Sequence, residues 1–95
     1  MRREELFELG DRVEALLNRF RSSLSPESAD AVEHYLEHDE FELALEGLCI
    51  DLIEQERLKG DALEECITLG RKLNLDEESV LRADFWVLLM KQKED

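Results

Sequence analysis

The sequence has few residues that interrupt helices or build specialised chemistry. It contains one proline, four glycines and two cysteines in 95 residues, and no stretch alternates with the period of a β-strand. Its longest apolar run, residues 85–90, is far too short to span a bilayer. Cys49 and Cys66 form no CxxC motif. These absences argue against a sheet, a disulfide framework and a cysteine-based metal site.

The start of the chain does not resemble a signal peptide. After Arg2 and Arg3 it becomes acidic at Glu4 and Glu5, where a secretory signal would become apolar. We therefore expect a cytoplasmic protein whose cysteines remain reduced.

Basic residues are scarce, and one long segment has none. The chain has 12 Lys and Arg against 25 Asp and Glu, a formal net charge of −13. Between Ser22 and Glu56 no Lys or Arg occurs, whereas eleven Asp and Glu do. Such a charge repels nucleic acid and anionic membranes, so we expect neither as a partner. A basic protein surface is the partner that this charge favours.

Apolar residues recur at helical spacing along the whole chain, which predicts an all-α protein. Its length suits one core, so we expect a single helical domain over residues 1–95. Short connections between helices favour a compact antiparallel bundle of about five helices. The expected helices cover residues 3–22, 26–37, 40–57, 61–74 and 77–91.

Polar residues at the expected helix starts match known capping patterns. Ser25 precedes Pro26, a serine cap followed by proline at the first helical position. Asp39 with Glu42, and Asp61 with Glu64, fit the capping box, and Asp76 is the expected cap of the last helix.

The third expected helix is apolar on two sides. Leu43 and Ile50 lie opposite its main apolar stripe, so this helix is either central in the bundle or partly exposed for a partner. The main stripe contains Phe41, Ala44, Leu45, Leu48 and Leu52.

The sequence offers little for catalysis. It has no Gly-rich phosphate loop and no nucleophile elbow, so we expect neither an enzyme nor a bound cofactor. His34 and His38 share a helix face and could bind zinc, but Tyr35 stands where a zinc hydrolase helix needs Glu. Two solvent-exposed histidines are the expected arrangement, with no metal.

Three other side chains have simpler readings. Cys49 and Cys66 occupy or border apolar stripes, so we expect small core residues. Asp84 interrupts an apolar run; it is either paired with a nearby base at the surface or a buried functional carboxylate.

The base-free segment has two readings, a solvated face or a docking surface. Mixed-sign helices gain ~0.2–0.5 kcal/mol from each favourable pair four residues apart, and these helices forgo that gain. A cationic partner would supply the missing charge. Tyr35 or Phe41 could anchor such a partner, although core packing is expected for both. The candidate contacts are Asp30, Glu33, Glu37, Asp39, Glu42 and Glu46.

Two motifs in this region resemble a known family. Residues 40–49 read Glu-Phe-Glu-Leu-Ala-Leu-Glu-Gly-Leu-Cys, and residues 69–76 read Leu-Gly-Arg-Lys-Leu-Asn-Leu-Asp. With them, the segment 32–76, roughly half the chain, is similar to the MafI-like immunity proteins of bacterial polymorphic and contact-dependent growth inhibition toxin systems. Phe41 stands where that family more often has Trp or Tyr.

The resemblance implies a cytoplasmic immunity protein that neutralises a cognate toxin domain. Many such toxins are nucleases, and this family is often associated with EndoU-type RNases, whose basic active site the acidic face would block. The alternative function is a helical adaptor or regulator. It would dock a partner, or a second copy of the chain, through Trp86, Leu81, Leu88 and Leu89 of the last helix.

Overall fold

The computed structural model describes residues 2–94, and in this range the chain forms α-helices, short 3-10 turns and no strand. The prediction of an all-α bundle is confirmed. The five helices are α1 (Arg3–Phe20), α2 (Pro26–Glu37), α3 (Phe41–Glu54), α4 (Gly60–Lys72) and α5 (Phe85–Lys91), with 3-10 turns at Arg21–Ser23 and Gln92–Glu94.

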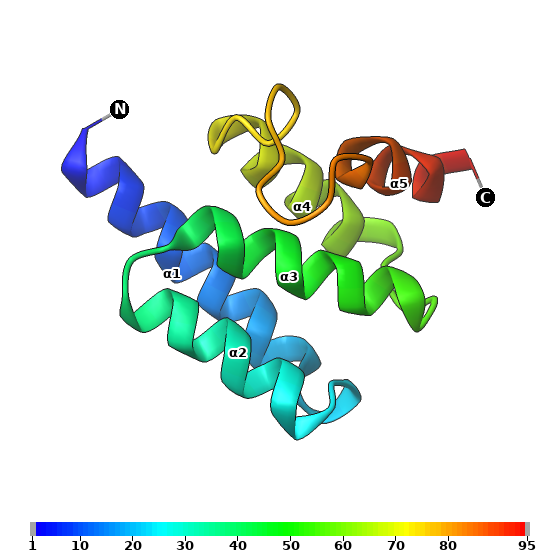
Figure 1. The fold of residues 1–95 in the computed structure, drawn as a ribbon, viewed down its shortest axis with the longest axis horizontal. Helices are drawn as coiled ribbons and strands as arrows, with labels where there is room; N and C mark the ends of the chain where they lie inside the picture. Colours follow the sequence, from blue (N-terminus) through cyan, green and yellow to red (C-terminus); the bar gives the residue numbers. More distant parts are fainter. Residues whose placement is uncertain (1, 95) are drawn as a thin grey trace.

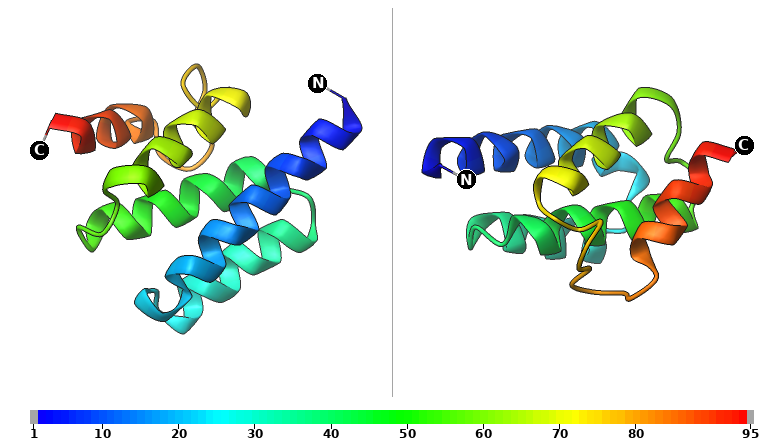
Figure 2. Two further views of the ribbon diagram at one scale, coloured as in Figure 1. Left: turned by 180° about the vertical axis from the view of Figure 1, so that it is seen from behind. Right: turned by 90° about the horizontal axis from the view of Figure 1, so that it is seen from above.

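Helix α3 lies in the middle of the molecule. Helices α1 to α4 run alternately in opposite directions, and α3 contacts α1, α2, α4 and α5 (Figures 1 and 2). Its main stripe is buried, and Leu43 and Ile50 on the other side are half-buried. Of the two readings of this helix, the central position is therefore correct.

Two glycines allow aromatic rings to pack directly on helix backbones. A Cβ atom built on Gly10 of α1 would lie 2.6 Å from ring atoms of Phe41, and one on Gly70 of α4 would lie 2.6 Å from the Trp86 ring. Both distances are shorter than any ordinary carbon contact. The rings thus join α1 to α3 and α4 to α5 through close approaches that only glycine permits.

Helices α2, α3 and α4 all end in the same hydrogen-bonded turn. Asp39, Glu56 and Asn74 have positive φ angles of 57°, 57° and 63°. After α3, the Arg57 N–H donates to the Leu52 carbonyl at 2.9 Å, and the Glu56 N–H donates to Ile53 at 3.0 Å. This pair of hydrogen bonds defines the Schellman motif, which usually has glycine at the left-handed position.

Of the predicted caps, only Ser25 is confirmed, with its hydroxyl accepting from the Ser28 N–H at 3.2 Å. The capping boxes at Asp39–Glu42 and Asp61–Glu64 are wrong: α3 and α4 start after Glu40 and Lys59, without a side-chain cap. Asp39 instead belongs to the turn that ends α2, where it has a left-handed conformation.

The predicted last helix is mostly wrong. It was expected from residue 77, capped by Asp76, but α5 begins at Phe85 and has only seven residues. Residues 76–84 form an irregular loop that passes beside α3, drawn in orange in Figure 1. The other helices end two or three residues earlier than predicted or match their expected ends.

Candidate partner-binding surface

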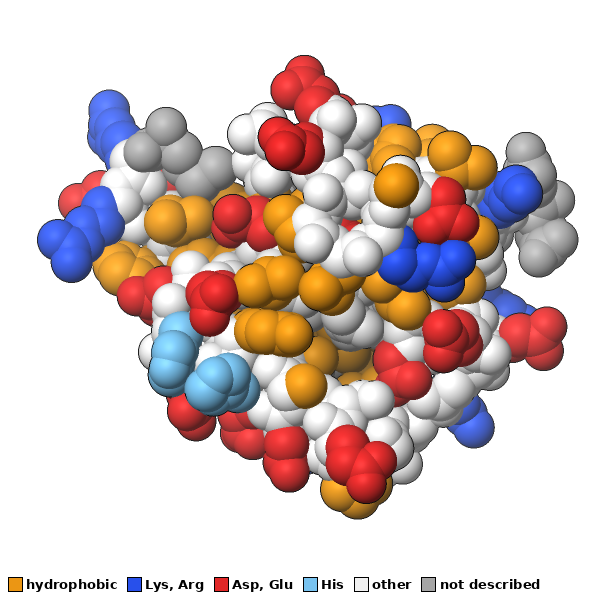
Figure 3. All heavy atoms as spheres, viewed as in Figure 1, with side chains coloured by type: hydrophobic (Ala, Val, Ile, Leu, Met, Phe, Trp, Pro, Cys, Tyr) orange, Lys and Arg blue, Asp and Glu red, His pale blue; other side chains and the backbone are white. Residues whose placement is uncertain are grey.

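The six predicted contact acids differ in exposure. Asp30, Glu37 and Asp39 are exposed, and Glu33 and Glu42 are half-buried. Glu46 is fully buried, at 0% exposure. In Figure 3, carboxylates and the two histidines surround a group of hydrophobic side chains on the face that carries α2 and α3. Five of the six acids therefore remain available to a partner.

These exposed acids have almost no cationic neighbours. Within residues 2–94, the one ion pair made by an acid of the base-free segment joins Glu33 to Arg21, with Nη2 and Oε1 3.4 Å apart. Asp30, Glu37, Asp39 and Glu42 form no ion pair in this part of the chain. Their charge is directed to solvent.

Two of the three acids of α4, Asp61 and Glu65, are paired with arginines of α1. Arg12 donates to both oxygens of Glu65, at 3.0 and 2.6 Å, and this hydrogen-bonded carboxylate raises the pKa of Arg12. Arg19 donates to both oxygens of Asp61, at 3.0 and 3.2 Å, which lowers the pKa of Asp61. These ion pairs connect α1 to α4 within the protein.

Glu46 does not belong to the contact surface, which corrects its predicted role. Its carboxylate accepts hydrogen bonds from three successive backbone N–H groups, those of Val80 at 2.9 Å, Leu81 at 2.8 Å and Arg82 at 2.7 Å. Successive N–H groups that converge on one anion form a backbone nest. Because the N–H groups of residues 80–82 donate to Glu46, they are not used for helical hydrogen bonds. The last helix therefore begins after this segment and not at residue 77 as predicted.

A sequence signal for the buried Glu46 was available. Glu46 lies three residues after Leu43 and four before Ile50, so it shares their helix face. Once α3 is central, that face must be covered, and its acid must find hydrogen-bond donors inside the protein. The donors lie more than thirty residues away, in a segment whose own pattern was helical.

A hollow lies between the start of α3 and the 76–84 loop. Asp39, Glu40, Glu42, Leu43 and Val80 line it, and we call these five residues the mixed groove. A second hollow on the other side of Asp39 is lined by two more acids. Its residues are Phe7, Gly10, Asp11, Glu14, Leu36, Asp39 and Phe41.

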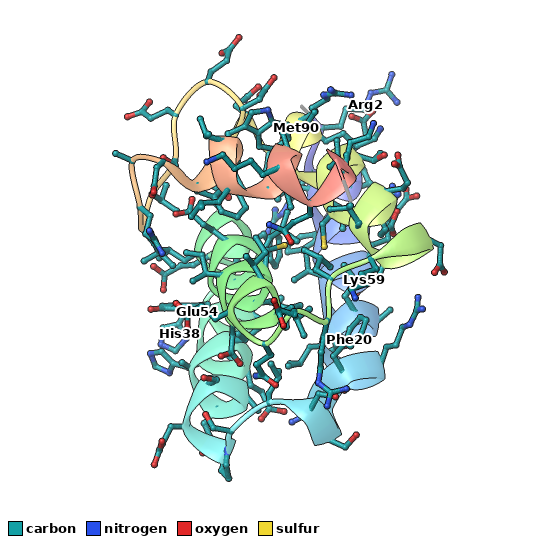
Figure 4. All side chains as sticks on the ribbon, turned by 90° about the vertical axis from the view of Figure 1, so that its right-hand side faces the viewer. Arg2, Phe20, His38, Glu54, Lys59 and Met90 are labelled. Atoms are coloured by element: carbon teal, nitrogen blue, oxygen red, sulfur yellow. The ribbon has the colours of Figure 1, made fainter. Side chains whose placement is uncertain are left out.

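The two histidines are exposed, as predicted. Their ring centroids are 4.4 Å apart, and Figure 4 shows His38 at the edge of the molecule with its ring pointing outward. Among the described residues, no three His, Cys, Asp or Glu side chains form a group that could hold a metal ion.

The other singled-out side chains are structural. Phe41 is buried and Tyr35 is half-buried. Asp84 is exposed and pairs with Arg82 at 3.1 Å, which selects the surface-pair reading. Cys49 and Cys66 are buried thiols, and the hydrogen bond between them, together with burial, raises the pKa of Cys49.

The residues proposed for docking through the last helix do not form one exposed surface. Leu89 is fully buried, and Trp86 packs against Gly70. Leu81 lies on the loop rather than on α5, where it covers Gly47 of α3. Val87 is the most exposed large apolar side chain of α5, at 58%.

No protein-family model matches the chain, and no curated protein or solved structure is significantly similar to it. In the described range, none of the helices combines the length and apolar character needed to cross a membrane.

Proposed function

We propose that this chain is an immunity protein that binds and neutralises a cognate bacterial toxin domain. The partner is a basic nuclease, and the resemblance to MafI-like immunity proteins favours an RNase. Binding uses the acidic surface of α2 and the start of α3. The contacts are Asp30, Glu33, Glu37, Asp39 and Glu42, without Glu46.

The observation that carries this proposal is the unpaired charge of that surface. Within residues 2–94, the acids of α2 and α3 form no ion pair with lysine or arginine except that of Glu33 with Arg21. A nuclease needs a cationic groove to hold phosphate, and a negative surface of this size complements such a groove. Occupying the groove excludes RNA by competition, so inhibition requires no chemistry by this chain.

The same charge would speed association. Complementary fields raise association rate constants from ~10⁵–10⁶ M⁻¹s⁻¹ towards 10⁸ M⁻¹s⁻¹ at low salt. Screening shortens that attraction to about 10 Å at 0.1 M salt. We therefore expect the association rate to fall steeply as salt rises, with a smaller change in the dissociation rate.

The test uses a toxin nuclease domain encoded beside the gene for this chain. The purified toxin domain should form a one-to-one complex with the chain and should no longer cleave RNA when the chain is added. In cells that express the toxin domain, co-expression of the chain should prevent killing. The double reversal Asp30→Lys with Glu37→Lys should weaken the complex at least about a hundredfold, because each lost charge pair costs ~2–5 kcal/mol.

The matched control changes the same charge elsewhere. Glu77→Lys with Glu78→Lys alters two exposed acids of the 76–84 loop, which are not among the proposed contacts. This control should keep inhibition almost unchanged. Equal weakening by both double variants would show that only net charge matters. Unchanged inhibition in both would contradict the acidic surface, and failure of the unaltered chain to inhibit would contradict the immunity role.

A further inference from the structure

The mixed groove combines three carboxylates with two aliphatic side chains. Asp39 and Glu40 come from the turn between α2 and α3, Glu42 and Leu43 from the first turns of α3, and Val80 from the 76–84 loop. The groove therefore lies where segments about forty residues apart in sequence meet.

Its apolar wall is exposed and fixed in position. Val80 is 46% exposed and the neighbouring Leu81 is 44% exposed. Both are held at the surface because Glu46 binds their backbone N–H groups at 2.9 and 2.8 Å. A wall held in this way loses little conformational entropy when a ligand binds.

The acidic side is also fixed. The Glu40 N–H donates to the Tyr35 carbonyl at 2.8 Å and the Asp39 N–H donates to Leu36 at 3.1 Å, so the turn that carries both acids is held by α2. In the described part of the chain, none of the three groove carboxylates forms an ion pair. The groove is thus preformed and lacks only its counter-charge.

We infer that the mixed groove binds one arginine or lysine side chain of the partner protein. These side chains carry an aliphatic stem and a charged head, and they bury the stem while the head remains among polar groups. The stem lies between Leu43 and Val80, and the cationic head lies among Asp39, Glu40 and Glu42. This inference rests on the proposed function, in which the partner is a basic toxin domain.

The inference separates two parts of the surface by their physical role. Acids on α2 attract the partner at a distance, whereas the groove holds a single side chain by contact. Glu46 acts as a positioning residue, because it touches no partner but holds the groove wall. The chemistry excludes an anionic ligand, since three carboxylates would repel it.

A short peptide tests the groove without the toxin. The probe is acetyl-Leu-Arg-Leu-amide, titrated into the ¹⁵N-labelled full chain and followed by NMR. We expect saturable shifts confined to the amides of residues 39–43 and 80–82, and no shifts with acetyl-Leu-Glu-Leu-amide. Shifts spread over all acidic helices would show simple charge attraction and would overturn the inference.

A matched pair of variants locates the contact. Val80→Arg places a cation at the groove wall and should weaken peptide binding at least about tenfold. Val87→Arg adds the same charge to another exposed valine, on α5, and should leave binding within about twofold. Equal weakening by the two variants would contradict the groove.

Val80→Arg and the α2 double reversal, compared in the toxin assay, separate the two proposals. If Val80→Arg leaves toxin inhibition intact while the α2 double reversal abolishes it, the groove is wrong and the immunity role stands. If the peptide binds at the groove but no toxin domain is inhibited, the immunity role is wrong and the groove stands.

Discussion

The α1–α4 side and the α2–α3 side of this molecule use negative charge in different ways. On the first, Glu65 and Asp61 each accept two hydrogen bonds from the guanidinium group of an arginine on the neighbouring helix. On the second, Asp30, Glu37 and Asp39 are exposed and form no ion pair with any residue that the structure describes. The buried Glu46 bonds to backbone rather than to a base. Acids of similar sequence context thus hold the fold together on one side and leave a surface free on the other.

The largest effect is expected where an acid of the second side enters the core. Glu46→Ala removes the acceptor of three N–H groups and should lower the free energy of unfolding by about 3 kcal/mol, since hydrogen bonds to charged groups contribute ~1.5–3 kcal/mol. Urea unfolding measures the loss, and hydrogen exchange should show lost protection at residues 80–82. Glu54→Gln on the same helix is the control and should stay within about 0.5 kcal/mol.

An intact loop in Glu46→Ala, with native exchange at these amides, would show that the carboxylate does not hold it.

The next effect concerns an acid in a strained conformation. Glu56 has a φ of 57°, which costs a residue with a side chain ~1–2 kcal/mol. Glu56→Gly should therefore raise the free energy of unfolding by about 1 kcal/mol, measured by urea unfolding. Glu54→Gly, two residues earlier in helical backbone, should instead lower it by about 0.5–1 kcal/mol. The same sign for both would contradict the strain at Glu56.

A matched pair tests the comparison directly. Glu65→Gln removes a carboxylate gripped by Arg12 and should lower the free energy of unfolding by about 0.5–1 kcal/mol at low salt. Glu37→Gln removes an unpaired acid and should leave stability unchanged or slightly raised, since it reduces repulsion. Urea unfolding at low and high salt provides both values. Equal losses would mean that the two sides do not differ.

The smallest effect is a dependence on pH. Because Arg19 lowers the pKa of Asp61, the pair stabilises the fold above the ordinary aspartate pKa of ~4, and that contribution is lost as pH falls through the lowered value. Asp61→Asn should therefore lose less stability than the parent between neutral pH and about pH 3. Arg19→Gln should reduce this acid dependence equally, and the double variant should add nothing. An unchanged pH profile would contradict the pairing.

The sequence was sufficient for the features that depend on local pattern. The apolar stripes of α1, α2 and α4 and the Ser25 cap involve residues within a few positions of each other, so spacing revealed them. The exposure of Asp30 and Glu37 followed from the same periodicity. Leu43 and Ile50 indicated that α3 is apolar on two sides before its neighbours were known.

The errors arose where distant or unusual contacts decide the backbone. Residues 77–84 have a helical pattern, but the Glu46 carboxylate accepts hydrogen bonds from the N–H groups of Val80, Leu81 and Arg82, a contact that local sequence rules do not include. The turns at Asp39 and Glu56 have acidic residues at the left-handed position, where a glycine would have indicated the end of a helix. Within the candidate site, the mixed groove could not be predicted because it needs Val80 beside Leu43, a juxtaposition that depends on Glu46.

The attachment of the 76–84 loop through main-chain atoms has a consequence for sequence change. Carboxylate oxygens bind peptide N–H groups that almost every amino acid possesses, so these hydrogen bonds do not depend on which side chains stand at positions 80 and 81. Position 80 is the freer of the two to vary in size, polarity and charge, because the Leu81 side chain also packs against Gly47 of α3. Diversification of partner choice at this edge would then leave folding untouched, provided that proline avoids the three bonded positions and Glu46 is kept.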